Sequence, residues 1–225
     1  MKRRTYLGLA ALALAGCSSD DGNAGPGNAT TGTNESSDAT TSEGGSDPRL
    51  FDGSGAATTG TFELGGGITA FDMEHVGDGS FQVELVDDAS GKTVEFVANE
   101  MGQWQGRIPY GVDAGTYVLR VSTDGEWGIE VRQPGPSGSD AAEPSLSLSG
   151  DSPDYEGPVE FSGETTFTGR YDSNGVFNVS VLDAEGDETS VFKEMRSFEG
   201  EETVATDGTG WVRVVANGEW ELAVE

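Results

Sequence analysis

The chain has 225 residues, with 40 acidic against 12 basic side chains and a formal net charge of −28. A surface with this charge repels nucleic acids and anionic lipids, which excludes proteins that bind them by electrostatic attraction. The single cysteine excludes an intramolecular disulfide, so the fold must be stabilised by packing alone.

Residues 1–16 are expected to form a signal peptide. Basic residues at positions 2–4 precede an apolar run, 6–15, that is too short to cross a bilayer. The paired arginines in RRTYL indicate twin-arginine export. The sequence LAGC, residues 14–17, resembles the lipobox of secreted lipoproteins, which implies cleavage before Cys17 and lipid on its sulfur. Stable anchoring of Cys17 to the membrane needs a lipid with two chains.

The acidic character has two interpretations. Removal of the signal peptide takes away three basic and no acidic residues, so the net charge goes from −28 to −31. The mature chain is either a polyanion that captures cations or basic partners, or a protein that works in concentrated salt, where charge repulsion is screened. Acidic residues are spread along the whole mature chain, and this spread favours the second interpretation.

Residues 17–48 are expected to form a disordered tether that starts at the lipidated Cys17. This segment is rich in Ser, Thr, Gly and Asp and contains almost no large apolar residue, so it cannot bury enough surface to offset the entropy of ordering. A flexible chain of this length has a reach of roughly 30–35 Å. Asn28 and Asn34 lie in candidate N-glycosylation sequons.

Residues 49–132 and 145–225 are two copies of one domain, joined by a linker at 133–144. Three blocks repeat in the same order and at nearly the same spacing: TAFDMEHVGDGSFQVELVD with TTFTGRYDSNGVFNVSVLD, EMGQWQG with EMRSFEG, and AGTYVLRVSTDGEWGIEV with DGTGWVRVVANGEWELAV. Three ordered matches of this length indicate an internal duplication.

Each copy alternates apolar and polar residues with a period of two, as antiparallel strands with one buried face do. Three Xaa-Gly dipeptides suited to two-residue hairpins lie between these runs: Asp124-Gly125, Asn174-Gly175 and Asn217-Gly218. The segments DDASGK (87–92) and DAEGDE (183–188) suit longer hairpin loops. The sequence therefore predicts an all-β protein with two tandem antiparallel β-sandwich (jelly-roll-like) domains after the disordered tether.

Few residues offer catalytic chemistry. His75 is the only histidine, no serine lies in a nucleophile elbow, and the ligands of a zinc site and the lysine of a phosphate-binding loop are missing. We therefore expect no enzyme activity, cofactor or metal. The segments DAEGDE and YDSNG have oxygen donors near a glycine and are interpreted as turns, with a calcium site as the alternative. His75 is interpreted as a polar aromatic residue at a strand end.

The tryptophans separate into two kinds. Trp127 and Trp220 occupy equivalent positions in the two copies and are expected in the cores. Trp211 has Val118 as its counterpart and is out of phase with the inward-facing Val212, so its side chain is expected on the outer face. It either contacts the other domain or is merely exposed, or it forms a platform for a sugar or peptide.

With its RRTYL…LAGC leader, its acidic and lysine-poor body and its polar tether, the chain resembles haloarchaeal twin-arginine surface lipoproteins. The two repeats are more weakly similar to pre-peptidase C-terminal domains. The resemblance implies a surface module without catalytic residues. We expect a non-enzymatic, lipid-anchored protein of the cell surface with a structural or binding role and an envelope protein or glycan as partner. The alternative is a carbohydrate- or peptide-binding module that uses exposed aromatic residues.

Overall fold

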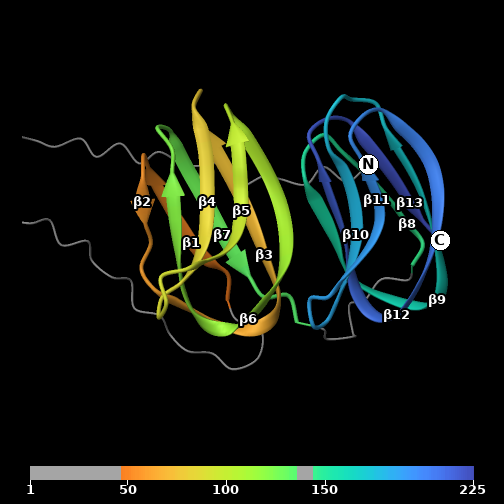
Figure 1. Cartoon of the computed structure of the whole chain (residues 1–225), viewed down its shortest axis with the longest axis horizontal. Helices are drawn as coiled ribbons and strands as arrows, with labels where there is room; N and C mark the ends of the chain where they lie inside the picture. Colours follow the sequence, from red (N-terminus) through yellow and green to blue (C-terminus); the bar gives the residue numbers. More distant parts are fainter. Residues whose placement is uncertain (1–46, 136–143) are drawn as a thin grey trace, which may run out of the picture. The chain divides into compact units, whose positions relative to one another are not determined.

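The computed structural model describes residues 47–135 and 144–225 (Figure 1). Cys17, Asn28, Asn34, the signal peptide and most of the expected tether and linker lie outside the described residues. The described residues belong to one compact unit, Asp38–Glu225, and consist of strands and turns. None of them forms a helix long and apolar enough to span a membrane.

The first domain is an antiparallel sheet of seven strands that curls into a sandwich. The strand order is β1-β7-β3-β6-β4-β5, and the short β2 pairs with β6. The strands are β1 (Arg49–Ser54), β2 (Ala57–Thr58), β3 (Phe62–Val76), β4 (Ser80–Asp87), β5 (Thr93–Met101), β6 (Trp104–Ser122) and β7 (Glu126–Arg132).

The second domain repeats this topology with six strands. Their order is β8-β13-β9-β12-β10-β11, which matches the first domain strand by strand apart from β2. The strands are β8 (Leu146–Gly150), β9 (Asp154–Tyr171), β10 (Phe177–Asp183), β11 (Glu188–Glu194), β12 (Phe198–Ala216) and β13 (Trp220–Val224). The predicted all-β fold with two tandem antiparallel sandwiches is therefore confirmed.

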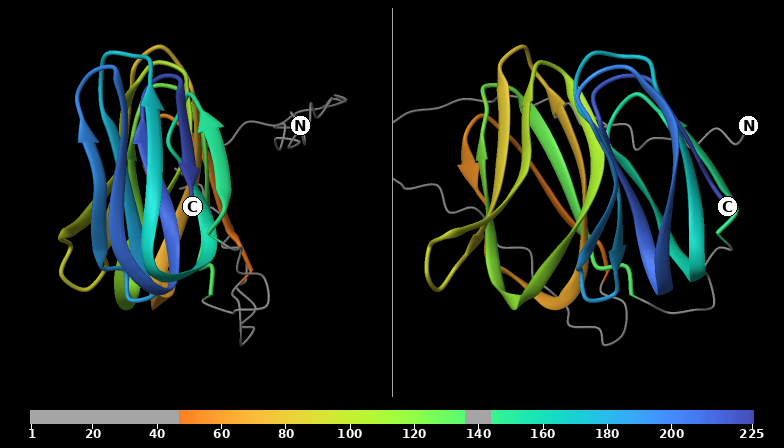
Figure 2. Two further views of the ribbon diagram at one scale, coloured as in Figure 1. Left: turned by 90° about the vertical axis from the view of Figure 1, so that its right-hand side faces the viewer. Right: turned by 45° about the vertical axis from the view of Figure 1, so that its right-hand side comes forward.

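Two long strands in each domain bend and thereby take part in both layers of the sandwich. The last part of β3 pairs with β7, whereas the last part of β6 pairs with β4. In β3 the bend is at Gly66 and Gly67, whose φ angles are 87° and 82°. Only glycine adopts this conformation without strain. The right-hand view of Figure 2 shows that the strands of each domain curl around a separate interior.

The two interiors are filled by equivalent side chains. Phe71 and Phe81 are fully buried in the first domain, and Phe167 and Phe177 are their counterparts in the second. Trp127 and Trp220 lie in these cores, as predicted. Each indole nitrogen donates to a backbone carbonyl 3.0 Å away, of Gly55 and Ser152 respectively. Burial of matching side chains explains why these positions agree between the copies.

The predicted two-residue hairpins are wrong at all three Xaa-Gly dipeptides. The strands on either side of each dipeptide pair with other strands and not with each other. Gly125 instead packs against the ring of His75 and the carbonyl oxygen of Val76, where a Cβ would not fit. Glycine at this position allows the two turns to pack closely. The two longer loops do form hairpins, β4 with β5 and β10 with β11.

Candidate functional site: the contact between the two domains

Trp211 is the one proposed ligand-contact residue that lies within the described part of the chain. It lies in β12, on the face opposite the inward-facing Val212, but only 1% of its surface is exposed. The indole therefore does not offer an exposed platform for a sugar or peptide. The other interpretation, a contact between the domains, describes its surroundings.

The apolar centre of this contact is a small cluster around Trp211. Its indole packs with Leu182 of β10 and with Ile68 of the first domain, and Tyr155 and Ala184 close its edge. All three central side chains are buried. They project from outer faces, which are buried here only because one domain covers the other.

The backbone around Trp211 fits the indole tightly. Gly157 in β9 has no room for a side chain because the indole packs on it, and the β9–β12 register shifts at Trp211 as in a β-bulge. Gly111 and Gly186, one from each domain, approach so closely that a Cβ on either would meet the other. The indole Nε1 is buried without a hydrogen-bond partner. An unpaired donor of this kind costs about 1–3 kcal/mol.

Arg107 of β6 forms one polar edge of the contact. Its Nε lies 3.4 Å from Asp72 in the same domain and 3.0 Å from Asp154 in the other. These are ion pairs whose angles do not make hydrogen bonds, so Nε itself lacks a hydrogen-bond acceptor. Its Nη2 donates to the carbonyl oxygen of Tyr155 at 2.9 Å, and the guanidinium lies 4.7 Å from the centre of that ring. Arg107 thus joins Asp72 of its own domain to Asp154 and Tyr155 of the other.

Burial shifts the pKa of Asp72. Removal of its carboxylate from water raises the pKa of Asp72 above 3.8, and the nearby Arg107 and Arg132 only partly oppose this effect. Arg132 contacts the second carboxylate oxygen of Asp72 at 3.3 Å and Glu130 at 2.6 Å. The edge of the contact is therefore a network of opposite charges.

Arg213 of β12 forms the second polar edge. It pairs with Glu188 at 2.6 Å, donates to Ser180 at 3.1 Å and reaches the carbonyl oxygen of Pro109 in the first domain at 3.5 Å. Its guanidinium also lies 5.8 Å from the ring centre of Tyr110. Burial, followed by the charge of nearby glutamates, raises the pKa of Tyr110 to about 12.

The contact combines groups that hold surfaces together, namely a packed tryptophan and arginine–carboxylate pairs. Comparison of the two copies in the sequence had indicated only Trp211 among these residues. Asp72 and Arg107 have Thr168 and Glu201 as counterparts, so a disagreement between the copies was the available signal here too. No pattern in the sequence indicated that Ile68 meets Trp211, because that contact joins outer faces of two domains.

His75 is buried and stacked on Phe81, with ring centres 4.9 Å apart. Its Nδ1 lies 2.7 Å from the carbonyl oxygen of Gly102, and its Nε2 lies 2.7 Å from the hydroxyl of Thr123. A neutral ring that donates from Nδ1 and accepts at Nε2 satisfies both contacts. Tyr171 stacks in the same way on Phe177 in the second domain. The histidine has the structural role expected from its alignment with tyrosine.

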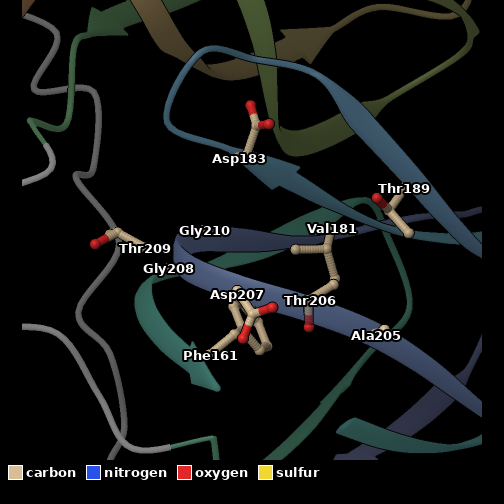
Figure 3. Close-up of a pocket in the computed structure, with 10 residues that line it drawn as sticks. All are labelled: Phe161, Val181, Asp183, Thr189, Ala205, Thr206, Asp207, Gly208, Thr209 and Gly210. Carbon is tan, nitrogen blue, oxygen red and sulfur yellow. The ribbon is translucent and has the colours of Figure 1, made fainter. Parts of the chain in front are cut away.

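A shallow pocket of about 180 Å³ lies at the bend of β12 in the second domain (Figure 3). It is smaller than the cavities of roughly 300–1,000 Å³ that hold most small-molecule ligands. Its polar side chains already serve the fold: Asp207 accepts from the Gly163 nitrogen, and Asp183 accepts from the nitrogens of Glu185 and Asp187. Within residues 47–135 and 144–225, no group of three or more acidic, histidine or cysteine residues is placed to hold a metal ion.

Comparison with known proteins identifies no family. No family model matches this chain, and no curated protein matches its sequence. An exported protein and a protein of unknown function are among the similar solved structures. The PBSX exported protein XepA is 8% identical with a TM-score of 0.25 and alignment over 80% of this chain and 86% of its own. A conserved protein of unknown function from Pseudomonas aeruginosa is 13% identical with a TM-score of 0.22, over 79% and 80%.

A variant of oxalate decarboxylase from Bacillus subtilis is 12% identical with a TM-score of 0.19, over 82% of this chain and 73% of its own. Structural similarities this low do not support any inference about function.

Proposed function

We propose that this chain is a non-enzymatic, lipid-anchored protein of the cell surface, adapted to concentrated salt, with a structural or binding role in the envelope. The observation that supports the structural part is the contact at Trp211. It joins two copies of one domain through residues that differ between the copies, including Trp211 against Val118 and Arg107 against Glu201. Such a contact holds a two-domain body together at the end of the expected tether.

The arrangement of charges supports adaptation to salt. Five arginines of the described part are engaged in ion pairs: Arg107, Arg120, Arg132, Arg170 and Arg213. With 12 basic residues against 40 acidic ones, most carboxylates have no basic residue to pair with. Their mutual repulsion weakens when salt shortens the screening length. We expect the free energy of unfolding to rise with added potassium chloride.

The anchor is supported by the leader sequence and is tested on the mature protein. Mass spectrometry of protein extracted from membranes should show a chain that begins at Cys17 and carries lipid on its sulfur. The Cys17→Ser variant, which keeps the folded body intact, should appear in the medium or remain unprocessed. A mature Cys17 without lipid would overturn the proposed anchor.

One observation favours the binding form of this role. Phe96 in β5 is 53% exposed, although Trp211, the aromatic residue expected outside, is buried. An exposed ring of this size is suited to recognition of a peptide.

A further inference from the structure

The two domains share neither a sheet nor a core. Their strands belong to separate sheets, one of seven strands and one of six. The core of the first domain has 17 buried residues, all between positions 62 and 131, and that of the second has 14, all between 159 and 224. Loss of the contact between the domains therefore leaves both sheets paired and both cores complete. Parts of a protein that are stabilised separately can open separately.

The apolar part of the contact is small by comparison. Its buried residues are Ile68, Leu182 and Trp211. Two buried N–H groups at the contact, Nε1 of Trp211 and Nε of Arg107, have no hydrogen-bond acceptor. Water supplies acceptors to both groups when the domains separate, so their desolvation opposes the contact. Domains of one chain commonly move relative to one another unless the interface between them is large and apolar.

Both domains are strongly acidic. Residues 47–135 contain 15 acidic and 5 basic side chains, a net charge of −10, and residues 144–225 contain 18 and 4, a net charge of −14. Arg107 and Asp154 form an ion pair across the contact at 3.0 Å, whereas Arg132 and Arg213 pair with carboxylates of their own domains. The contact therefore joins two bodies of like charge.

Salt determines how far the repulsion between the domains reaches. The screening length is about 3 Å at 1 M ionic strength and about 10 Å at 0.1 M. Concentrated salt screens most carboxylates of the two domains from one another but leaves the packing of Trp211 on Ile68 and the hydrogen bond from the Arg107 nitrogen to the Pro153 carbonyl oxygen. The partly buried Arg107–Asp154 pair is also screened less than exposed charges. In dilute salt the repulsion extends over the whole contact, so dilution acts against it.

We propose that the contact around Trp211 is a salt-dependent switch, which is closed in concentrated salt and opens in dilute salt while both domains remain folded. Opening uncovers Trp211 and Leu182 on the second domain and Ile68 on the first. The indole, buried in the closed chain, then becomes accessible from solution. This inference rests on the proposed adaptation to concentrated salt and does not depend on the lipid at Cys17.

Quenching of tryptophan fluorescence by acrylamide, a neutral probe, measures this opening in the full chain. When potassium chloride is lowered from about 3 M to about 0.1 M, the quenching constant should rise while the far-ultraviolet circular dichroism of the strands is retained. Trp211→Phe should remove most of this rise. Trp220→Phe is the matched control, because Trp220 lies in the core of the second domain, and it should keep the rise.

Two aspartate variants test the role of charge at the contact. Asp154→Asn removes the acidic partner of Arg107 across the contact and should move the midpoint of opening to higher potassium chloride. Asp172→Asn removes the same charge from the same domain, but Asp172 pairs with Arg170 within that domain. This control should leave the midpoint unchanged or move it to lower potassium chloride, because it only reduces the repulsion.

Three results would overturn the switch: quenching that rises only with loss of the circular dichroism signal, equal quenching at all salt concentrations, or equal shifts in both aspartate variants. Sedimentation in dilute salt should show a monomer, and a dimer would instead assign the uncovered faces to a second copy and refute the open monomer. The proposed adaptation to salt is tested separately by urea unfolding. It stands if the free energy of unfolding rises with potassium chloride while Trp211 stays buried in every folded state, and it fails if that free energy does not rise.

Discussion

Replacement of Trp211 by valine, the residue of the other copy, tests whether the contact between the domains is built as described. Truncation of a buried tryptophan to alanine costs about 3–5 kcal/mol. Valine retains part of the contact with Leu182 and Ile68, and the variant loses an unpaired Nε1 whose burial costs about 1–3 kcal/mol. We expect Trp211→Val to lower the free energy of unfolding by only about 1–2 kcal/mol.

Trp220→Val is the matched control, because its indole lies in the core of the second domain and donates to Ser152. It should cost about 3–5 kcal/mol. Urea unfolding at fixed high salt measures the free energy of unfolding of both variants. Hydrogen exchange shows which strands each substitution destabilises. Trp211→Val should accelerate exchange around Ile68 and Ala184 while the interior strands stay protected. An equal cost in the two variants, or unchanged exchange at Ile68, would refute the assignment of Trp211 to a domain contact.

Three further predictions concern single side chains. Met101 and Met195 are 74% and 73% exposed, whereas Met73 is buried. Dilute hydrogen peroxide should therefore oxidise the two exposed methionines to sulfoxides about tenfold faster than Met73. Equal oxidation rates in peptide mass analysis would contradict the fold at these positions. Asp72 has a raised pKa, so its favourable contribution to the free energy of unfolding is complete below pH 3.8. This contribution is lost as the pH rises through the pKa of Asp72 in the folded state. Urea unfolding should show Asp72→Asn gaining stability relative to the natural chain over that rise, and a relative loss would reverse the sign. His75→Phe removes the hydrogen bonds to the half-buried Gly102 carbonyl and Thr123 hydroxyl and should cost about 1–3 kcal/mol by the same measurement. A neutral result would show that the ring is not hydrogen-bonded.

Local pattern predicted the interior of each domain well. Alternation identified the buried faces of strands such as β4 and β6, and the repeat identified Trp127 and Trp220 as core residues. These features depend on neighbours within one strand or on agreement between copies, and a sequence contains both kinds of information.

Features that depend on distant surfaces could not be predicted in the same way. The Xaa-Gly dipeptides were assigned to hairpins because a hairpin turn and a turn between strands that pair with other strands use the same residues. Whether adjacent strands pair with each other depends on the strand order of the whole sheet, in which β6 and β7 each pair with β3 and β12 and β13 each pair with β9. Trp211 was correctly placed on the outer face of its own domain. Its burial depends on Ile68 of the other domain, a contact that no local pattern records.

The differences between the copies explain why residues 47–135 and 144–225 form a single contact of this type. A face that packs against the bend of the neighbouring domain makes a head-to-tail interface, and identical copies could extend such an interface without limit. The first domain has Ile68 at its bend, whereas the second has the exposed Glu164 at the equivalent position. The bend of the second domain therefore cannot pack on the equivalent pair, Val86 and Val118, of another molecule as Ile68 packs on Trp211.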